Sequence, residues 1–274
     1  MSSFTPGAVA PIIGDGQNRG GRARPPRKEE QARAMGQNLP CVRRTVRKGA
    51  FAMPETSSAV QMSDARRTLA FLTLSGGFQD AYTYMGRGRV FANAQTGNIV
   101  LLGVNLCEGQ WGASLRYLLP VLAFAAGVYA AAWVRGRAAP GRRLHWRQAV
   151  LAVEIVLLAA VGFMPPALDL AANVLVSFSC AMQVQAFRKL RGTAYASTMC
   201  IGNLRSAMQA LYEWRHGEAE AGLRAAQYFG MLALFAAGAA LGGLLTLAFG
   251  LRVIWGSCAL LVVSFGLMFR EKDA

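Results

Sequence analysis

An acid and an amide are adjacent in sequence within the first long apolar stretch of the 274-residue chain. They are Gln79 and Asp80, at the end of a Ser-Gly-Gly-Phe-Gln-Asp segment. A carboxyl group inside a membrane is costly unless it is paired, protonated or hydrated, so Asp80 is the main candidate for a functional group. The alternative is that Asp80 lies near the outer end of its helix and pairs with Arg87 or Arg89.

A second group of polar residues follows, in the stretch Asn-Ala-Gln-Thr-Gly-Asn at residues 93–98. Gly97 permits a helix break and close packing, and the side chains of Thr96 and Asn98 offer hydrogen bonds. We therefore predict a broken helix whose polar groups, that of Asn93 included, line a cavity. The alternative is that these groups satisfy one another where two helices meet.

These polar residues are exceptions in an apolar chain, in which 54% of the residues are hydrophobic and 16% are charged. A soluble protein does not have this composition. A helix that crosses a membrane needs about 20 apolar residues, since its backbone polar groups must be satisfied within the helix. Six segments come close to this length: residues 68–86, 115–134, 148–164, 171–187, 225–250 and 253–269.

Two further stretches, residues 91–107 and 195–212, are shorter and carry several amide side chains together with Arg205. As helices that face lipid they would be costly. We expect them to be re-entrant or broken helices within a bundle that is otherwise all-α.

The two halves of the chain carry the same pattern of residues in the same order, which indicates an internal duplication. Asp80 has the apolar Val184 as its counterpart, so any role of this acid belongs to one half only. The matched pairs are Ser75 with Ser179, Gln79 with Gln183, Gly97-Asn98 with Gly202-Asn203, and Phe124-Ala-Ala-Gly127 with Phe235-Ala-Ala-Gly238.

Charged loops decide between two topologies, because loops rich in Lys and Arg stay in the cytoplasm. Eight spans would place the basic cluster at residues 135–147 outside the cell. Six spans, with the two short polar stretches not crossing, place this cluster and both termini in the cytoplasm. Three spans in each half require the second half to enter the membrane from the opposite side. We therefore predict two inverted repeats in the inner membrane, one covering residues 66–164 and the other residues 169–270.

Residues 1–65 are basic and rich in Gly, Pro, Gln and Ser, and the first thirty contain no apolar core of signal-peptide length. We predict a disordered tail, since the segment has too little apolar surface to offset the entropy of ordering. Anionic lipid is the expected partner of this tail. The net charge of +15 lies in the tail and in loops beside apolar segments, which argues against nucleic acid as a partner.

The sequence contains no signature of an enzyme, and we expect neither a metal site nor a cofactor. The five cysteines lack C-x-x-C spacing, and the two histidines, His145 and His216, lie in charged loops. Glu154 is a second acid in an apolar segment, for which a proton-relay role and pairing with an arginine both stay open. The small-residue face at Gly238 and Gly242 predicts close helix packing.

The motif of the first half resembles that of a known family. It consists of Ser75-Gly-Gly-Phe-Gln-Asp-Ala, then Val90-Phe-Ala-Asn-Ala-Gln-Thr-Gly-Asn, and then Leu101-Leu-Gly. This pattern is similar to the YoaK-like family of small bacterial integral membrane proteins, a domain of unknown function. The resemblance covers roughly residues 65–269 and departs from the family pattern at residues 183–185 and 198–202. It implies a membrane location and the extent of the fold, and it implies no activity.

Inverted repeats whose discontinuous polar helices meet near the midplane recur in transporters and channels. We therefore expect a transporter or channel for an unidentified small solute. The alternative is a non-transporting membrane scaffold or a lipid-associated assembly factor, and a homo-oligomer is open in either case. The residues expected to bind solute are Gln79, Asp80, Asn93, Thr96, Gly97, Asn98, Gln183, Gly202 and Asn203.

Overall fold

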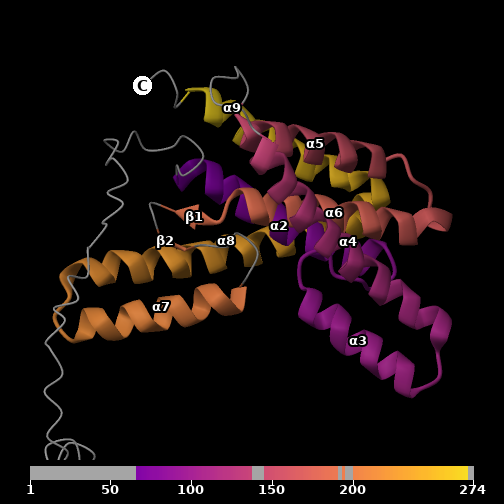
Figure 1. The fold of residues 1–274 in the computed structure, drawn as a ribbon, viewed down its shortest axis with the longest axis horizontal. Helices are drawn as coiled ribbons and strands as arrows, with labels where there is room; N and C mark the ends of the chain where they lie inside the picture. Colours follow the sequence, from indigo (N-terminus) through magenta and orange to yellow (C-terminus); the bar gives the residue numbers. More distant parts are fainter. Residues whose placement is uncertain (1–65, 138–144, 191–192, 195–199, 271–274) are drawn as a thin grey trace, which may run out of the picture. The chain divides into compact units, whose positions relative to one another are not determined.

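The computed structural model describes residues 66–137, 145–190, 193–194 and 200–270, and these are mainly α-helical (Figure 1). The predictions for the tail at residues 1–65 and for the centre of the 135–147 loop lie outside the described residues. A short antiparallel ladder pairs β1 (Lys189–Leu190) with β2 (Thr193–Ala194). The helices are α2 (Arg66–Gly86), α3 (Gln95–Cys107), α4 (Trp111–Arg137), α5 (Trp146–Val161), η2 (Pro166–Leu168), α6 (Asp169–Ala186), α7 (Cys200–Arg215), α8 (Ala219–Phe249), η3 (Gly250–Val253) and α9 (Ile254–Arg270).

The α-helices of the described residues stand where the sequence predicted them. Each of the six apolar segments forms one helix, and the two short polar stretches form α3 and α7. Three helical stretches in this part of the chain are long and apolar enough to cross a membrane, namely Trp111–Arg137, Pro166–Ala186 and Ala219–Met268, the last containing both α8 and α9. α5 is shorter, and α2 contains several polar side chains. The prediction of a helical bundle is confirmed.

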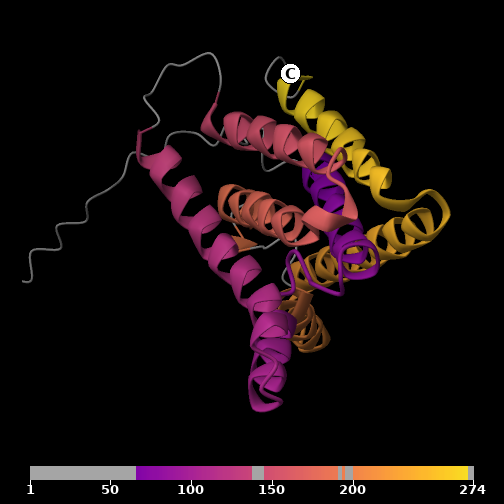
Figure 2. The same cartoon turned by 90° about the vertical axis from the view of Figure 1, so that its right-hand side faces the viewer.

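The helices pack in two matching sets. α2 packs along α8 and α9, while α6 packs along α4 and α5. Of the two short helices, α3 lies along α4 and α7 lies along α8. Figure 2 shows the same bundle from the side, with α5 and α9 next to each other.

Glycines bring these long helices into backbone contact, and Gly238 and Gly127 are two examples. A Cβ atom on Gly238 of α8 would overlap the main chain of α2 at Leu74. A Cβ atom on Gly127 of α4 would overlap the main chain of α6 at Phe178. Small residues allow helices in membranes to approach this closely. The predicted packing role of Gly238 is confirmed.

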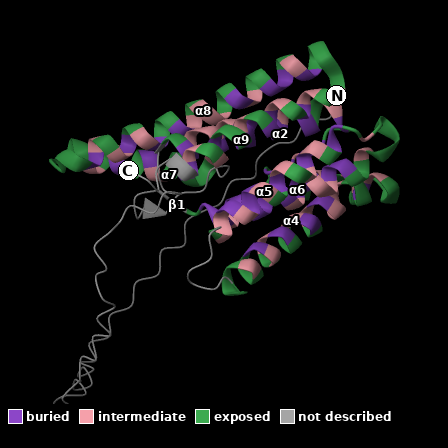
Figure 3. Cartoon of the chain, turned by 90° about the horizontal axis from the view of Figure 1, so that it is seen from above, coloured by how far each residue is buried: buried purple, intermediate pink, exposed green. Residues whose placement is uncertain are grey.

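Buried residues lie where the helices face one another, and exposed residues lie on their outer faces (Figure 3). Many of the exposed residues are large and apolar. Leu72, Leu151, Leu158 and Leu261 belong to one fully buried apolar cluster. An apolar outer surface is suited to contact with lipid. Exposed examples are Trp111, Tyr129, Phe163, Leu247 and Phe249.

The first turns of α3 and α7 both face the middle of the bundle. Figure 1 shows α3 joined to α4 at one edge of the view and α7 joined to α8 at the opposite edge. Since these joints lie at the C-terminal ends of the short helices, their N-terminal ends point inward. The N-terminal end of a helix carries partial positive charge from its free amide groups.

The predicted helix break at Gly97 is wrong. α3 runs without interruption from Gln95 to Cys107, so Gly97 is its third residue. A Cβ atom on Gly97 would lie 2.9 Å from Cδ2 of Phe91, so this glycine makes room for an aromatic ring. Gly202 is likewise the third residue of the continuous helix α7. The non-helical chain on which a polar site could be built precedes α3, at residues 90–94.

Candidate functional site

Asp80 lies in the second half of α2 and is 6% exposed. Its Oδ1 accepts a hydrogen bond of 2.7 Å from the main-chain amide of Asn93, two residues before α3 begins. The amides of Ala92 and Ala94 also act on this carboxyl group. A carboxylate is stabilised at the N-terminal end of a helix by these amides and by the helix dipole. Asp80 therefore holds the start of α3.

The alternative in which Asp80 pairs with Arg87 is wrong. Arg87 is fully buried, and its Nη1 forms an ion pair of 2.8 Å with Asp169 at the start of α6. Its Nε donates to the hydroxyl of Tyr82. No ion pair to Asp80 occurs among the described residues. The remaining N–H groups of Arg87 donate to the main-chain oxygens of Val161, Met164 and Pro165.

Asn98 holds the same non-helical segment from the other side. Its Oδ1 accepts from the amide of Phe91 at 3.0 Å, and its Nδ2 donates to the carbonyl of Phe91 at 2.7 Å. The same Nδ2 also donates to the side chain of Gln95. Asn98 is fully buried, so its hydrogen-bonding groups are used within the protein. We call Asp80 and Asn98, together with residues 91–93 between them, the α3 clamp.

Asn93 provides the clamp with a free acceptor. Its Nδ2 donates to the carbonyl of Gly76 on α2 at 3.2 Å, whereas its Oδ1 is buried and has no hydrogen-bond partner. An unsatisfied buried amide oxygen costs about 1–3 kcal/mol. This oxygen and the carboxyl group of Asp80 are polar groups to which a bound molecule could donate hydrogen bonds.

The second short helix begins at Cys200, which is partly buried. Asn203 is buried on the next turn. Gly202 and Thr96 are exposed, so the structure does not bring these two predicted residues into the buried site.

Gln79 belongs to a separate group of buried polar residues where four long helices meet. Its Nε2 lies 3.0 Å from the hydroxyls of Ser75 and Ser257 and 3.3 Å from Oε1 of Glu154. The thiol of Cys180 donates to its Oε1 at 2.6 Å. We call these five residues the central cluster; they come from α2, α5, α6 and α9.

Glu154 is fully buried in the central cluster, and its Oε2 has no hydrogen-bond partner. None of the ion pairs in the described part of the chain involves this acid. Gln183, the counterpart of Gln79, is also buried and donates to the carbonyl of Leu72 on α2. Sequence reasoning missed Ser257 and Cys180, because a single small polar residue in an apolar helix gives no sign of a partner over 100 residues away.

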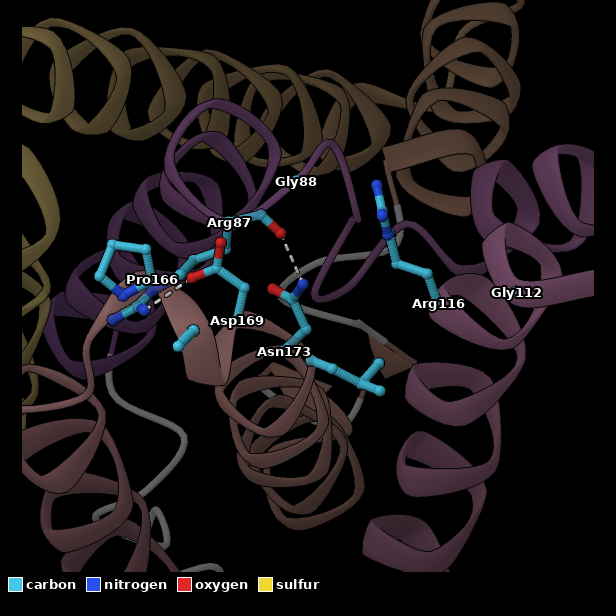
Figure 4. Close-up of a pocket in the computed structure, with 9 residues that line it drawn as sticks. Arg87, Gly88, Gly112, Arg116, Pro166, Asp169 and Asn173 are labelled. Atoms are coloured by element: carbon cyan, nitrogen blue, oxygen red, sulfur yellow. Dashed lines mark hydrogen bonds and ion pairs between the residues drawn. The ribbon is translucent and has the colours of Figure 1, made fainter.

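A cavity of about 350 Å³ lies at the ends of α2, α4 and α6 (Figure 4). None of the nine residues predicted to bind solute lines it. In the described residues no group of three His, Cys, Asp or Glu side chains is placed to hold a metal ion. We call this space the end cavity; its lining residues are Arg87, Gly88, Gly112, Arg116, Pro166, Ala167, Asp169, Leu170 and Asn173.

Comparison with known proteins places the chain in a family. A family model described as "Protein of unknown function (DUF1275)" matches residues 68–267. The chain is 30% identical over 151 residues to the UPF0700 transmembrane protein YoaK of Bacillus subtilis (strain 168). This alignment covers 52% of the chain and 64% of the relative, which is less than two thirds of the relative's length. No solved structure matches. Since the family model covers most of the chain, this protein is a helical membrane protein of the DUF1275 family, as its YoaK-like motif predicted.

Proposed function

We propose that the protein is an inner-membrane permease for a small solute, with the solute bound next to Asp80. The observation that carries this proposal is the buried carboxyl group of Asp80, which holds the start of α3 and has no cation partner in the described residues. An acid inside a membrane protein is costly to keep, and such acids mark the paths of solutes and ions.

The packing of the helices supports two inverted repeats. α2 meets α8 and α9 as α6 meets α4 and α5, which is the pairing expected when α2 to α5 and α6 to α9 are equivalent sets. Gly238 and Gly127 are matched between the two halves of the sequence, and they contact Leu74 and Phe178, which directly precede the matched pair Ser75 and Ser179. In Figure 1, α7 runs from the middle toward the left edge and α3 runs toward the lower right, so the two short helices end on different sides of the bundle.

The same arrangement supports six spans with both termini on one side. A short helix that begins in the middle of the bundle and ends at its edge crosses only half of the membrane. α3 and α7 both have this form, so the six longer helices are left to cross. The positive-inside rule then assigns the side of the termini to the cytoplasm.

The chemistry of the clamp favours a solute that donates hydrogen bonds or carries positive charge. The positive ends of α3 and α7 point inward, but the carboxyl group of Asp80 already occupies the amides before α3. The groups left for a solute are the carboxyl of Asp80 and the unpartnered Oδ1 of Asn93, both acceptors. Both residues are more than nine-tenths buried, so a solute reaches them only when a neighbouring helix moves.

A non-transporting scaffold is the second candidate. It is favoured by the closure of the α3 clamp, in which Asn98 uses its polar groups on the main chain. It is also favoured by the position of the end cavity, which reaches neither Asp80 nor Asn98. A scaffold needs no movement of α3, whereas a permease does.

Uptake profiling of a deletion strain over a panel of small solutes tests the permease. The wild-type gene should restore the uptake of one class of solute, and Asp80→Asn should not. Asn still offers an oxygen to the amide of Asn93, so this variant should insert and fold as the wild type does.

The matched control is Glu108→Gln, which makes the same change of acid to amide at the exposed C-terminal end of α3. It should restore full uptake, and thermal unfolding in detergent should show all three proteins folded. If Asp80→Asn restores full uptake, the proposed solute site at Asp80 is refuted. If no solute of the panel is taken up differently with and without the protein, the scaffold is favoured.

A further inference from the structure

The end cavity has two walls of different chemistry. One wall is formed by α4, where Arg116 lies over Gly88; a Cβ atom on that glycine would be 3.8 Å from Cδ and Nη1 of the arginine. Gly88 has a φ of +82°, a conformation that favours glycine, so the chain here stays open to the arginine. The other wall is formed by the first turns of α6, which carry Asp169 and Asn173 (Figure 4).

Arg87 contributes no free donor to this cavity. Its guanidinium has five N–H groups, and the structure gives it five acceptors. Its positive charge is balanced by Asp169 at 2.8 Å. The side chain is fully buried, so it fixes the wall of the cavity and is not available to a ligand.

Arg116 is the opposite case. It is exposed, and it takes part in no hydrogen bond or ion pair within the described residues. A guanidinium with five free donors in a fixed fork is suited to a carboxylate or a phosphate. The α4 wall therefore offers a site for an anionic group.

The α6 wall offers acceptors. Arg87 engages only Oδ1 of Asp169, which leaves Oδ2 of this partly exposed carboxylate. Nδ2 of Asn173 donates to the main-chain oxygen of Arg87, while Oδ1 of Asn173 is buried without a partner. Asp169 and Asn173 are one turn apart and lie on the same face of α6. A carboxylate and an amide oxygen together suit a primary ammonium group.

We propose that the end cavity binds a small zwitterion, with its anionic group on Arg116 and its primary ammonium group on Asp169 and Asn173. A free α-amino acid and the headgroup of an ethanolamine phospholipid share this chemistry. The cavity volume of about 350 Å³ lies at the lower end of the range of about 300–1,000 Å³ found for ligand pockets. This site is distinct from Asp80, and binding at it does not depend on whether the protein transports a solute.

Thermal unfolding of the full-length protein in detergent tests the proposal, with L-alanine, acetate and ethylamine compared at equal concentration. L-Alanine should raise Tm, since a ligand that binds only the folded state stabilises it. Acetate carries only the anionic group and ethylamine only the ammonium group, so each should raise Tm less than L-alanine does. Arg116→Gln should weaken the apparent affinity for L-alanine about tenfold or more, which is the effect of losing one charge-assisted pair.

The matched control is Arg252→Gln, at an exposed arginine of η3 outside the cavity, which should leave binding unchanged. Nanodiscs of phosphatidylethanolamine and of phosphatidylglycerol distinguish the two sources of the ligand. If phosphatidylethanolamine raises Tm and Arg116→Gln abolishes this effect, the site binds the lipid headgroup. If only L-alanine raises Tm, the site binds a free zwitterion. The proposal is overturned if acetate matches L-alanine, if Arg116→Gln binds as the wild type does, or if neither zwitterion shifts Tm.

Discussion

Two pairs of helices in the bundle have the same packing and different chemistry. Gly238 of α8 lies against Leu74 of α2, and Gly127 of α4 lies against Phe178 of α6, so a glycine meets main chain in both contacts. The polar groups are not preserved, because Asp80 has Val184 as its counterpart. Close packing restricts every position at which two backbones meet, whereas a buried acid is needed only once. The comparison separates residues that the fold requires from residues that a function would require.

The largest expected effect tests the shared packing. Gly127→Leu and Gly238→Leu should each destabilise the protein by at least about 3 kcal/mol, because the new side chain meets main-chain atoms that cannot move aside. Gly230→Leu, in the same helix as Gly238 but facing open space, is the control and should have little effect. Thermal unfolding of the purified proteins measures all three. A mild effect at one glycine and a severe effect at the other would contradict equivalent packing in the two halves.

A smaller effect is expected at the α3 clamp. Asn98→Leu removes the partners of both main-chain groups of Phe91, at a cost of about 1–3 kcal/mol for each buried group left unpaired. Asn105→Leu in the same helix is the control, since the carbonyl of Leu101 to which Asn105 donates is also available to the α-helix. Hydrogen exchange of the Phe91 amide should accelerate in the first variant only. Unchanged exchange in Asn98→Leu would show that another group holds the segment.

The smallest effect compares the two equivalent glycines of the short helices. Gly97→Ala places a methyl group 2.9 Å from the ring of Phe91 and should destabilise the protein by about 1 kcal/mol. Gly202→Ala meets open space and should be neutral or stabilising by up to about 1 kcal/mol, because alanine is the better helix former. Chemical unfolding of both variants gives the sign of each change. Equal destabilisation by both would mean that the two short helices begin in the same way.

The sequence predicted the positions of the helices well, because each apolar run of nearly membrane-spanning length forms one helix. It predicted that Asp80 lies within the first long helix from its place in an apolar stretch, and it predicted the packing of Gly238 from residue size. The sequence did not predict side-chain contacts between residues that are far apart along the chain. Arg87 finds Asp169 more than 80 residues further along, and Glu154 meets Ser257 through Gln79, which no local pattern encodes.

The predicted helix break at Gly97 was wrong for a different reason. A glycine between polar residues favours a helix break, but glycine also makes room for a close neighbour such as the ring of Phe91. The ring of Phe91 lies over the first turn of α3, and Asn98 fixes Phe91 in that position. The two uses of glycine cannot be separated without the tertiary contact.

The five hydrogen bonds of Arg87 have a consequence for the order in which the protein is made. Its acceptors lie at residues 82, 161, 164, 165 and 169, so four of the five are synthesised long after α2 has left the ribosome. A guanidinium without partners is costly in hydrocarbon, and until then Arg87 must be kept in water beyond the bilayer. The turn between α5 and α6 therefore completes the anchoring of α2, and the first half of the chain reaches its final structure only as the second half begins to insert.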